Sequence, residues 1–278
     1  MKPRPGFPAR LPPLSGSAPA ASQRSPRQVS IRGLLPEASL RGALTSPVQT
    51  LHTPIKSMPQ ATGLGLDSSV VRARMVRQLA EQGLQDPWVL QAMVDVERHR
   101  FVETALAGQA YEDTSLPIGW GQTISKPNVV ARMMELLRQG AQGKLGRVLE
   151  IGTGCGYQAA LLSQVATEVY SIERLRGLHE KAKKNLLPFR LPNVHLLLGD
   201  GMLGFPKGAP YAGIISAAGG QDVPVAWLDQ LAVGARLVAP TVTSAGHQAL
   251  VVISKTVTGF DRQVLEAVHF VPLKSGIA

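Results

Sequence analysis

The sequence predicts an α/β fold: a doubly wound, mostly parallel sheet with helical N-terminal additions and an antiparallel C-terminal strand pair. Two observations support this prediction. From Arg147 onward, short apolar strands alternate with helix-sized segments, and such alternation places parallel strands in one sheet with helices on both faces. The last two predicted strands have no helix between them, which indicates an antiparallel pair at the sheet edge.

Three helices are expected before the first strand of the sheet, at residues 69–82, 87–97 and 129–139. Proline in the first turn of the second helix and glycine after the first are typical of helix ends. Residues 101–128 lack clear periodicity and are expected to form a loop with short strands. The expected N-caps are Ser68 or Ser69, Asp86 and Asn128, and the apolar face of the first helix is expected to include Val71, Met75 and Leu79.

The sheet itself is expected to follow from residue 148. Its strands are short and apolar, as strands covered by helices should be. The predicted strands are residues 148–151, 168–172, 194–198, 211–216, 235–239, 249–254 and 263–270, with helices at 157–166, 174–186 and 225–231.

Composition divides the chain near residue 66. Residues 1–66 contain 11 of the 21 prolines, and their 8 Lys/Arg against one acid give a net charge of +7. Residues 67–278 hold 21 Lys/Arg and 18 acids, a net charge of +3. Because dense proline breaks helices and removes strand donors, we expect residues 1–66 to be a disordered basic tail and residues 67–278 to be the folded domain. Basicity that lies in a tail is weak support for a nucleic-acid-binding face.

The single cysteine, Cys155, excludes an intrachain disulfide and a cysteine-rich zinc site. A reducing compartment follows more easily than an oxidising one, so we expect a cytoplasmic protein, with organelle import through the Arg- and Ser-rich tail as the alternative. No apolar run has the length of a membrane span. The histidines lack metal-ligand spacing, so no metal is expected.

A glycine-rich turn follows the first predicted sheet strand: Glu150-Ile151, then Gly152-Thr153-Gly154-Cys155-Gly156. Glycines at a strand-to-helix turn let the backbone approach a ligand closely, and the helix N-terminus adds amide donors. A dinucleotide fingerprint would require its third glycine at position 157, which is Tyr157. The spacing therefore argues against NAD or FAD.

Two acids follow the next two strands. Glu173, 21 residues after Gly152, can accept hydrogen bonds from both hydroxyls of a ribose, and Asp200-Gly201 can reach an adenine amino group. Features at three successive strand ends share one rim of the sheet, where ligands bind in such folds. The combination predicts S-adenosylmethionine as cofactor. The alternative is that Glu150 and Asp200 only cap helices or bond loop amides.

A second motif precedes the helix at 129–139: Gly121-Gln122-Thr123-Ile124-Ser125-Lys126-Pro127. It could be an ordinary connector or a shaped loop for a small anion. With this segment the sequence resembles the protein-L-isoaspartate O-methyltransferase family, over roughly residues 71–273. The resemblance also includes His99-Arg100-Phe101-Val102, Ala110-Tyr111-Glu112-Asp113, Leu116-Pro117-Ile118, residues 129–133, residues 148–157, Gly199-Asp200-Gly201 and Val271-Pro272-Leu273.

The resemblance implies a methyltransferase domain over residues 67–278. It would transfer a methyl group from S-adenosylmethionine to the free carboxylate of L-isoaspartyl residues in damaged proteins, whose ester then collapses to a succinimide. Ser125 would be the active-site hydroxyl. The implied cofactor residues are Gln122, Thr123 and Ile124 in the upstream segment, Glu150, Gly152, Thr153, Gly154 and Gly156 around the glycine turn, Glu173 for the ribose, and Asp200 with Gly201 for the adenine.

Two departures and two alternatives accompany this interpretation. Cys155 stands where the family often has serine, and Gly219-Gly220 replaces its usual Pro-Pro. The first alternative is a methyltransferase of the same core acting on RNA or a small molecule, and the second is a binding module without turnover. We expect damaged proteins as partners, a monomer, and neither a specific nucleic acid nor a membrane.

Overall fold

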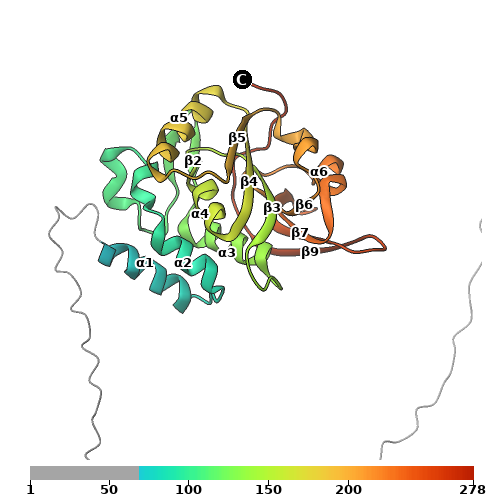
Figure 1. Ribbon diagram of the computed structural model, residues 1–278, viewed down its shortest axis with the longest axis horizontal. Coiled ribbons are helices and arrows are strands. Elements are labelled where there is room, and N and C mark those ends of the chain that lie inside the picture. The colour runs from blue at the N-terminus through green and yellow to red at the C-terminus, as the bar shows by residue number, and fades with distance from the viewer. Residues whose placement is uncertain (1–68) are drawn as a thin grey trace, which may run out of the picture. The chain divides into compact units, whose positions relative to one another are not determined.

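The computed structural model describes residues 69–278. The predicted tail, residues 1–66, lies outside the described residues. The described part centres on a seven-stranded sheet in the order β5-β4-β3-β6-β7-β8-β9 (Figure 1). Strands from β5 to β7 pair in parallel, and β8 and β9 are antiparallel to their neighbours. The predicted fold class is confirmed. The strands are β3 (Leu145–Ile151), β4 (Ala166–Glu173), β5 (Val194–Leu198), β6 (Tyr211–Ser216), β7 (Leu231–Val242), β8 (Gln248–Lys255) and β9 (Phe260–Ala267).

Neighbouring residues of the sheet strands face two different apolar layers. Val148 and Ile215 belong to the layer with most of the helices, whereas Leu149 and Ile214 face the layer that contains Trp227. This alternation follows from the period of two in a strand, and it covers both faces of the sheet with helices. They are α1 (Ser69–Glu81), α2 (Pro87–Asp95), α3 (Pro127–Arg138), α4 (Tyr157–Val165) and α5 (Arg176–Leu186) on the first side, and α6 (Val225–Gln230) on the second.

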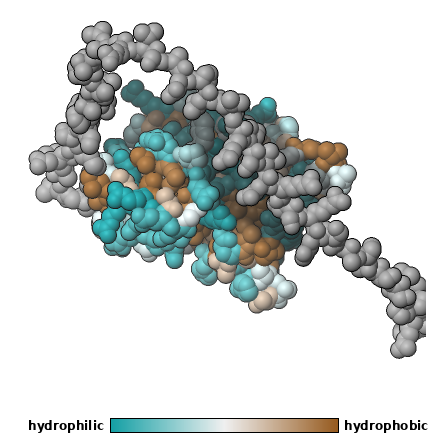
Figure 2. All heavy atoms as spheres, turned by 90° about the horizontal axis from the view of Figure 1, so that it is seen from below, coloured by the Kyte–Doolittle hydropathy of each residue, from teal (hydrophilic) through white to brown (hydrophobic). Residues whose placement is uncertain are grey.

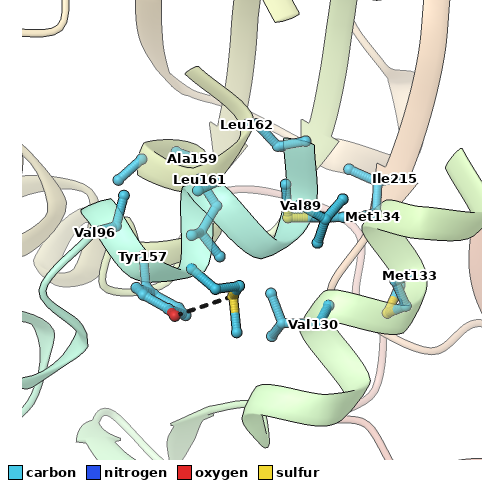
Figure 3. Close-up of a cluster of buried hydrophobic side chains, with 14 of the residues drawn as sticks. Val89, Val96, Val130, Met133, Met134, Tyr157, Ala159, Leu161, Leu162 and Ile215 are labelled. Carbon is cyan, nitrogen blue, oxygen red and sulfur yellow. Dashed lines mark hydrogen bonds between the residues drawn. The ribbon is translucent and has the colours of Figure 1, made fainter. Parts of the chain in front are cut away.

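The N-terminal helices form an outer layer. Helix α2 packs on α3 and α4, and α1 packs on α2. Figure 3 shows this layer, in which Val89 and Val96 belong to the same buried apolar cluster as Leu161 of α4 and Val130 of α3. The helical additions therefore share one core with the sheet rather than forming a separate unit.

The helix starts confirm one predicted cap and correct another. Asp86 accepts hydrogen bonds from the amides of Trp88 and Val89, as an N-cap should. The prediction that Asn128 caps α3 is wrong, because the helix already begins at Pro127. The Asn128 amide instead donates to Asp113 Oδ1 at 2.9 Å.

Two further expectations are corrected by burial and pairing. Val71, expected on the apolar face of α1, is 41 % exposed, and Val76 is buried in its place. Strand β9 begins three residues earlier than expected and ends at Ala267 rather than at residue 270. The first departure lies on the outermost helix and the second on the edge strand of the sheet.

The segment between α2 and α3 positions the site. It contains two short 3₁₀ helices, η1 (Arg98–Phe101) and η2 (Thr104–Gln109), and the hairpin β1 (Leu116–Gly119) and β2 (Gln122–Ile124). The expected loop with short strands is confirmed. Three more 3₁₀ turns follow α5 and β5.

Hydrophilic side chains cover much of the face shown in Figure 2, and apolar patches interrupt them. Among residues 69–278, no helix has the length and apolarity to cross a bilayer.

Candidate functional site

The carboxyl ends of β3, β4 and β5 bring the predicted cofactor residues together. The glycine turn follows β3, Glu173 ends β4, and Asp200 stands two residues beyond β5. The Gly154 amide donates to Glu173 Oε2 at 2.9 Å, and the Gly152 amide donates to the Ile172 carbonyl at 2.8 Å. The glycine turn and the two acids therefore lie at one edge of the sheet, as their spacing predicts.

The glycine turn has a backbone that side chains would oppose. Gly152, Gly154 and Gly156 have φ of +90°, +57° and +91°, in the region that favours glycine. A Cβ on Gly154 would lie 3.2 Å from Ile118 Cδ1. The turn is thus shaped by its own torsion angles and by the hairpin that approaches it.

Glu150 lies beneath this turn rather than at the open rim. Its side chain is fully buried, and Ser171 donates to its Oε2 at 2.5 Å. The Ser171 hydroxyl also lies 2.6 Å from Thr153 Oγ1. Burial raises the pKa of Glu150 to about 8, against the opposing effect of the hydrogen bond from Ser171. The carboxyl group thus reaches the glycine turn through two hydroxyls and has no surface for direct contact with a ligand.

The two rim carboxylates are held by backbone amides. Glu173 Oε1 accepts from Leu175 at 2.9 Å, in addition to the Gly154 bond. Asp200 Oδ1 accepts from Met202 at 2.8 Å, and its Oδ2 accepts from Gly276 at 2.7 Å. Each carboxylate oxygen has two lone pairs, so both groups retain acceptor capacity for a ligand.

Residues 271–278, here the C-terminal segment, run along this rim. Near the end of β6, the Gly219 amide donates to the Val271 carbonyl and the Leu273 amide donates to the Gly219 carbonyl, each at 2.8 Å. Farther along, the Ala278 amide donates to the Arg174 carbonyl and the Arg176 amide donates to the Ala278 carbonyl, each at 2.9 Å. The segment therefore links the end of β6 to the start of α5, past Asp200.

The β1–β2 hairpin borders the other side of the rim. Its tip contains three consecutive positive φ values, at Gly119, Trp120 and Gly121. The Trp120 indole packs against Gly177 at the start of α5, where an added Cβ would lie 2.3 Å from Trp120 Cζ2. Lys181 donates to the Ile118 carbonyl at 3.0 Å. These contacts join the hairpin to the helix that follows Glu173.

Ser125 lies between β2 and α3, half-buried at a cavity of about 970 Å³. Lys126, Arg132, Glu266 and His269 also line this cavity. A second cavity of about 820 Å³ is lined by Asp200 together with residues of β5 and α6. Ile124 is buried next to Ser125, and Gln122 and Thr123 lie toward the hairpin tip.

Cys155 is buried inside the glycine turn. Burial raises the pKa of its thiol to about 11, which makes it a poor nucleophile and agrees with a packing role. Among residues 69–278, no group of three or more His, Cys, Asp and Glu side chains could hold a metal ion.

Three features of the site were not predicted from the sequence. Arg98, fully buried, donates to the Ser125 carbonyl at 2.7 Å. The Gly276 amide donates a hydrogen bond to one carboxylate oxygen of Asp200, and Gly177 leaves room for the Trp120 ring. An arginine beside other polar residues, or a glycine inside a helix, carries no local signal of a contact with a residue far along the chain.

Comparison with known proteins identifies the family. The family model for protein-L-isoaspartate(D-aspartate) O-methyltransferase matches residues 70–278. The chain belongs to this family. A protein-L-isoaspartate O-methyltransferase from Methylibium petroleiphilum is 51 % identical over 99 % of this chain and 98 % of its own length. The corresponding protein from Leptothrix cholodnii is 58 % identical over 77 % of each chain.

Solved structures agree with this family assignment. A protein-L-isoaspartate O-methyltransferase structure has a TM-score of 0.67 and 28 % identity, over 74 % of this chain and 67 % of that one. A Plasmodium falciparum structure, described as a complex with S-adenosyl-L-homocysteine, has a TM-score of 0.64 over 73 % of this chain and 98 % of that one. At 22 % identity the second likeness shows the fold alone. The resemblance found in the sequence is thus confirmed for the protein-L-isoaspartate O-methyltransferase family.

Proposed function

We propose that this protein is a protein-L-isoaspartate O-methyltransferase. It transfers a methyl group from S-adenosylmethionine to the free carboxylate of L-isoaspartyl residues in damaged proteins and peptides. The observation that carries the proposal is the family match, which spans residues 70–278 and thus the whole described sheet. Relatives about half identical over nearly the full chain carry the same activity in their names.

The rim fits the proposed cofactor. Gly152 and Gly154 have positive φ and carry no side chain. Backbone groups therefore line the turn at the end of β3. Glu173 and Asp200 offer carboxylate oxygens at the next two strand ends, suited to ribose hydroxyls and an adenine amino group. In the proposal the glycine turn, Gly152 to Gly156, holds the methionine portion, Glu173 the ribose, and Asp200 with Gly201 the adenine.

The remaining predicted residues have supporting positions. Gln122, Thr123 and Ile124 approach from the hairpin, so we assign them to the wall between cofactor and substrate. Glu150 acts indirectly, because its burial leaves contact through Ser171 and Thr153. It stabilises the shape of the glycine turn rather than touching the cofactor.

The reaction needs little acid–base chemistry from the protein. S-adenosylmethionine, when bound, supplies an electrophilic methyl group on a sulfonium. A substrate carboxylate has a pKa of ~4 and is ionised at neutral pH, so no general base is required. In the proposal the Ser125 hydroxyl donates to this carboxylate and orients it, and the chain excludes water around it. Alignment of reacting groups is worth several kcal/mol in such displacements.

The cavity beside Ser125 supports a peptide substrate. Its volume of about 970 Å³ exceeds what one isoaspartyl side chain fills, and its charged lining suits the polar backbone and flanking residues of a damaged protein. We assign the isoaspartyl side chain to the Ser125 end of this cavity and the flanking chain to the part between α3 and β9.

The test is methyl transfer from labelled S-adenosylmethionine to two peptides that differ only in an isoaspartyl or an aspartyl bond. Base-labile label on the isoaspartyl peptide alone is expected. Ser125→Ala should lower kcat at least about tenfold without weakening S-adenosylhomocysteine binding. Ser115→Ala, which changes a serine of the same cavity, is the matched control and should retain activity. Tight cofactor binding with no label on either peptide would contradict the proposal and direct attention to RNA substrates.

We also propose a cytoplasmic monomer. The support is the single buried cysteine, which suits a reducing compartment, and a reaction that needs no second subunit in the arrangement above. Light scattering after size-exclusion chromatography measures the oligomeric state, and a dimer mass would refute the monomer.

A further inference from the structure

Arg98 connects the backbone segment at residues 110–114 to the turn that carries Ser125. It has no exposed surface. Its Nε donates to the Ala110 carbonyl at 2.8 Å, and its Nη2 donates to the Ser125 carbonyl at 2.7 Å. A longer bond from Nη2 reaches the Thr114 carbonyl at 3.5 Å. One rigid guanidinium thus fixes Ser125 relative to the segment after η2.

Arg98 forms no direct ion pair with a carboxylate among residues 69–278, and the Asp113 carboxylate acts on its charge from farther away. The hydrogen bonds of Arg98 are all accepted by backbone carbonyl oxygens. Its Nη1 is buried without a hydrogen bond to a described residue. Its guanidinium carbon lies 4.9 Å from the centre of the Tyr157 ring. Burial lowers its pKa below the ordinary arginine value, yet an arginine side chain stays protonated in proteins. A full positive charge is therefore held below the Ser125 turn.

Arg138 shows that this fold can neutralise a buried guanidinium. It is as deeply buried as Arg98, but its Nε lies 3.0 Å from Asp86 Oδ2. Burying a charge costs several kcal/mol unless a partner compensates it. Carbonyl dipoles and an aromatic face offset part of that cost at Arg98, but they leave its net charge in place.

We propose that Arg98 is the positioning residue for Ser125 and that its unneutralised charge makes the Ser125 site selective for an ionised substrate carboxylate. The proposal rests on the proposed function, because the substrate carboxylate supplies the missing negative charge. The two roles are separable. The guanidinium fork fixes the Ser125 backbone and hence the alignment of the hydroxyl, while the charge acts on the substrate through the low-dielectric interior.

The experiment uses the full chain with three variants. Arg98→Lys keeps the charge but cannot make both fork bonds, and Arg98→Gln loses the charge. Arg138→Lys is the matched control, since it also replaces a buried arginine but lies at the far end of α3. For each, we would measure kcat and KM with an isoaspartyl peptide, and the inhibition constant of the same peptide bearing a neutral isoasparaginyl residue. Circular dichroism and S-adenosylhomocysteine affinity report folding and the cofactor site.

Arg98→Lys should lower kcat about 10- to 100-fold, as a misaligned reacting group does, with the preference for the charged over the neutral peptide retained. Arg98→Gln should reduce that preference about tenfold. Arg138→Lys should change neither quantity.

Several results would overturn the proposal. They are a wild-type kcat in Arg98→Lys, an equal loss of affinity for both peptides in Arg98→Gln, and the same changes in Arg138→Lys. Loss of the native circular dichroism in both Arg98 variants, with Arg138→Lys folded, would assign Arg98 a purely structural role. If the wild type itself fails to methylate the isoaspartyl peptide, the proposed function fails instead.

Discussion

Replacing Glu150 with glutamine should change how the stability of the protein depends on pH. The pKa of Glu150 is about 8 in the folded protein, against an ordinary glutamate value of 4.5 that applies to the unfolded chain. Between these values the folded state keeps a proton that the unfolded state releases, so the free energy of unfolding falls as pH rises, by up to about 1.36 kcal/mol per pH unit. From pH 4.5 to 7 the wild type should lose about 3 kcal/mol through this group. Glu150→Gln has no proton to lose.

The assay is urea unfolding at pH 5, 6, 7 and 8 in the absence of cofactor. The free energy of unfolding of Glu150→Gln should fall less steeply than that of the wild type, and the gap between them should widen toward pH 8. Glu81→Gln, which changes an exposed carboxylate at the end of α1, is the control and should run parallel to the wild type. Parallel curves for Glu150→Gln and the wild type would refute the reasoning, because Glu150 would then be ionised in the folded state.

Three further perturbations test other contacts. Gly177→Ala should displace Trp120, since the new Cβ would lie 2.3 Å from the indole; S-adenosylhomocysteine affinity should fall and the indole fluorescence change, and unchanged values for both would contradict this packing. Removal of residues 274–278 removes the hydrogen bond from Gly276 to Asp200 and should weaken S-adenosylhomocysteine binding about fivefold in calorimetry, the worth of one hydrogen bond. Equal affinity would show that the C-terminal segment does not contribute to binding. Asp86→Ala removes an N-cap and the partner of Arg138 and should lower the free energy of unfolding by about 3–5 kcal/mol in urea, whereas a loss below about 1 kcal/mol would contradict the buried pair.

The features that could be predicted from the sequence are local ones. Asp86 followed by Pro87 is a complete helix start within two residues. The glycine turn and the acids at 173 and 200 also depend only on strand ends, and the topology of a parallel sheet then brings them to one rim. The positions of these residues in the sequence are therefore enough to predict that they lie at the same edge of the sheet.

The features that could not be predicted depend on distant partners. Asn128 has the residue type of an N-cap, yet Pro127 already lies in the first turn of α3. The backbone amide of Asn128 donates to Asp113, which is 15 residues away in the sequence. Arg98 resembles a surface residue until three carbonyls from later segments surround it. Glu150 was expected to bind the cofactor, but only the paired register of β3 and β4 shows Ser171 beside it. Long-range contacts of this kind leave no periodic trace in a sequence.

The position of Cys155 has a practical and a biological consequence. With a pKa of about 11, only about 1 in 10,000 of these thiols is ionised at neutral pH, and alkylating reagents and peroxides react with the thiolate. Labelling of the single cysteine in the sequence therefore reports how often the glycine turn opens, without any engineered probe. It also means that the thiol of the glycine turn is kept out of reach of oxidants while the protein is folded.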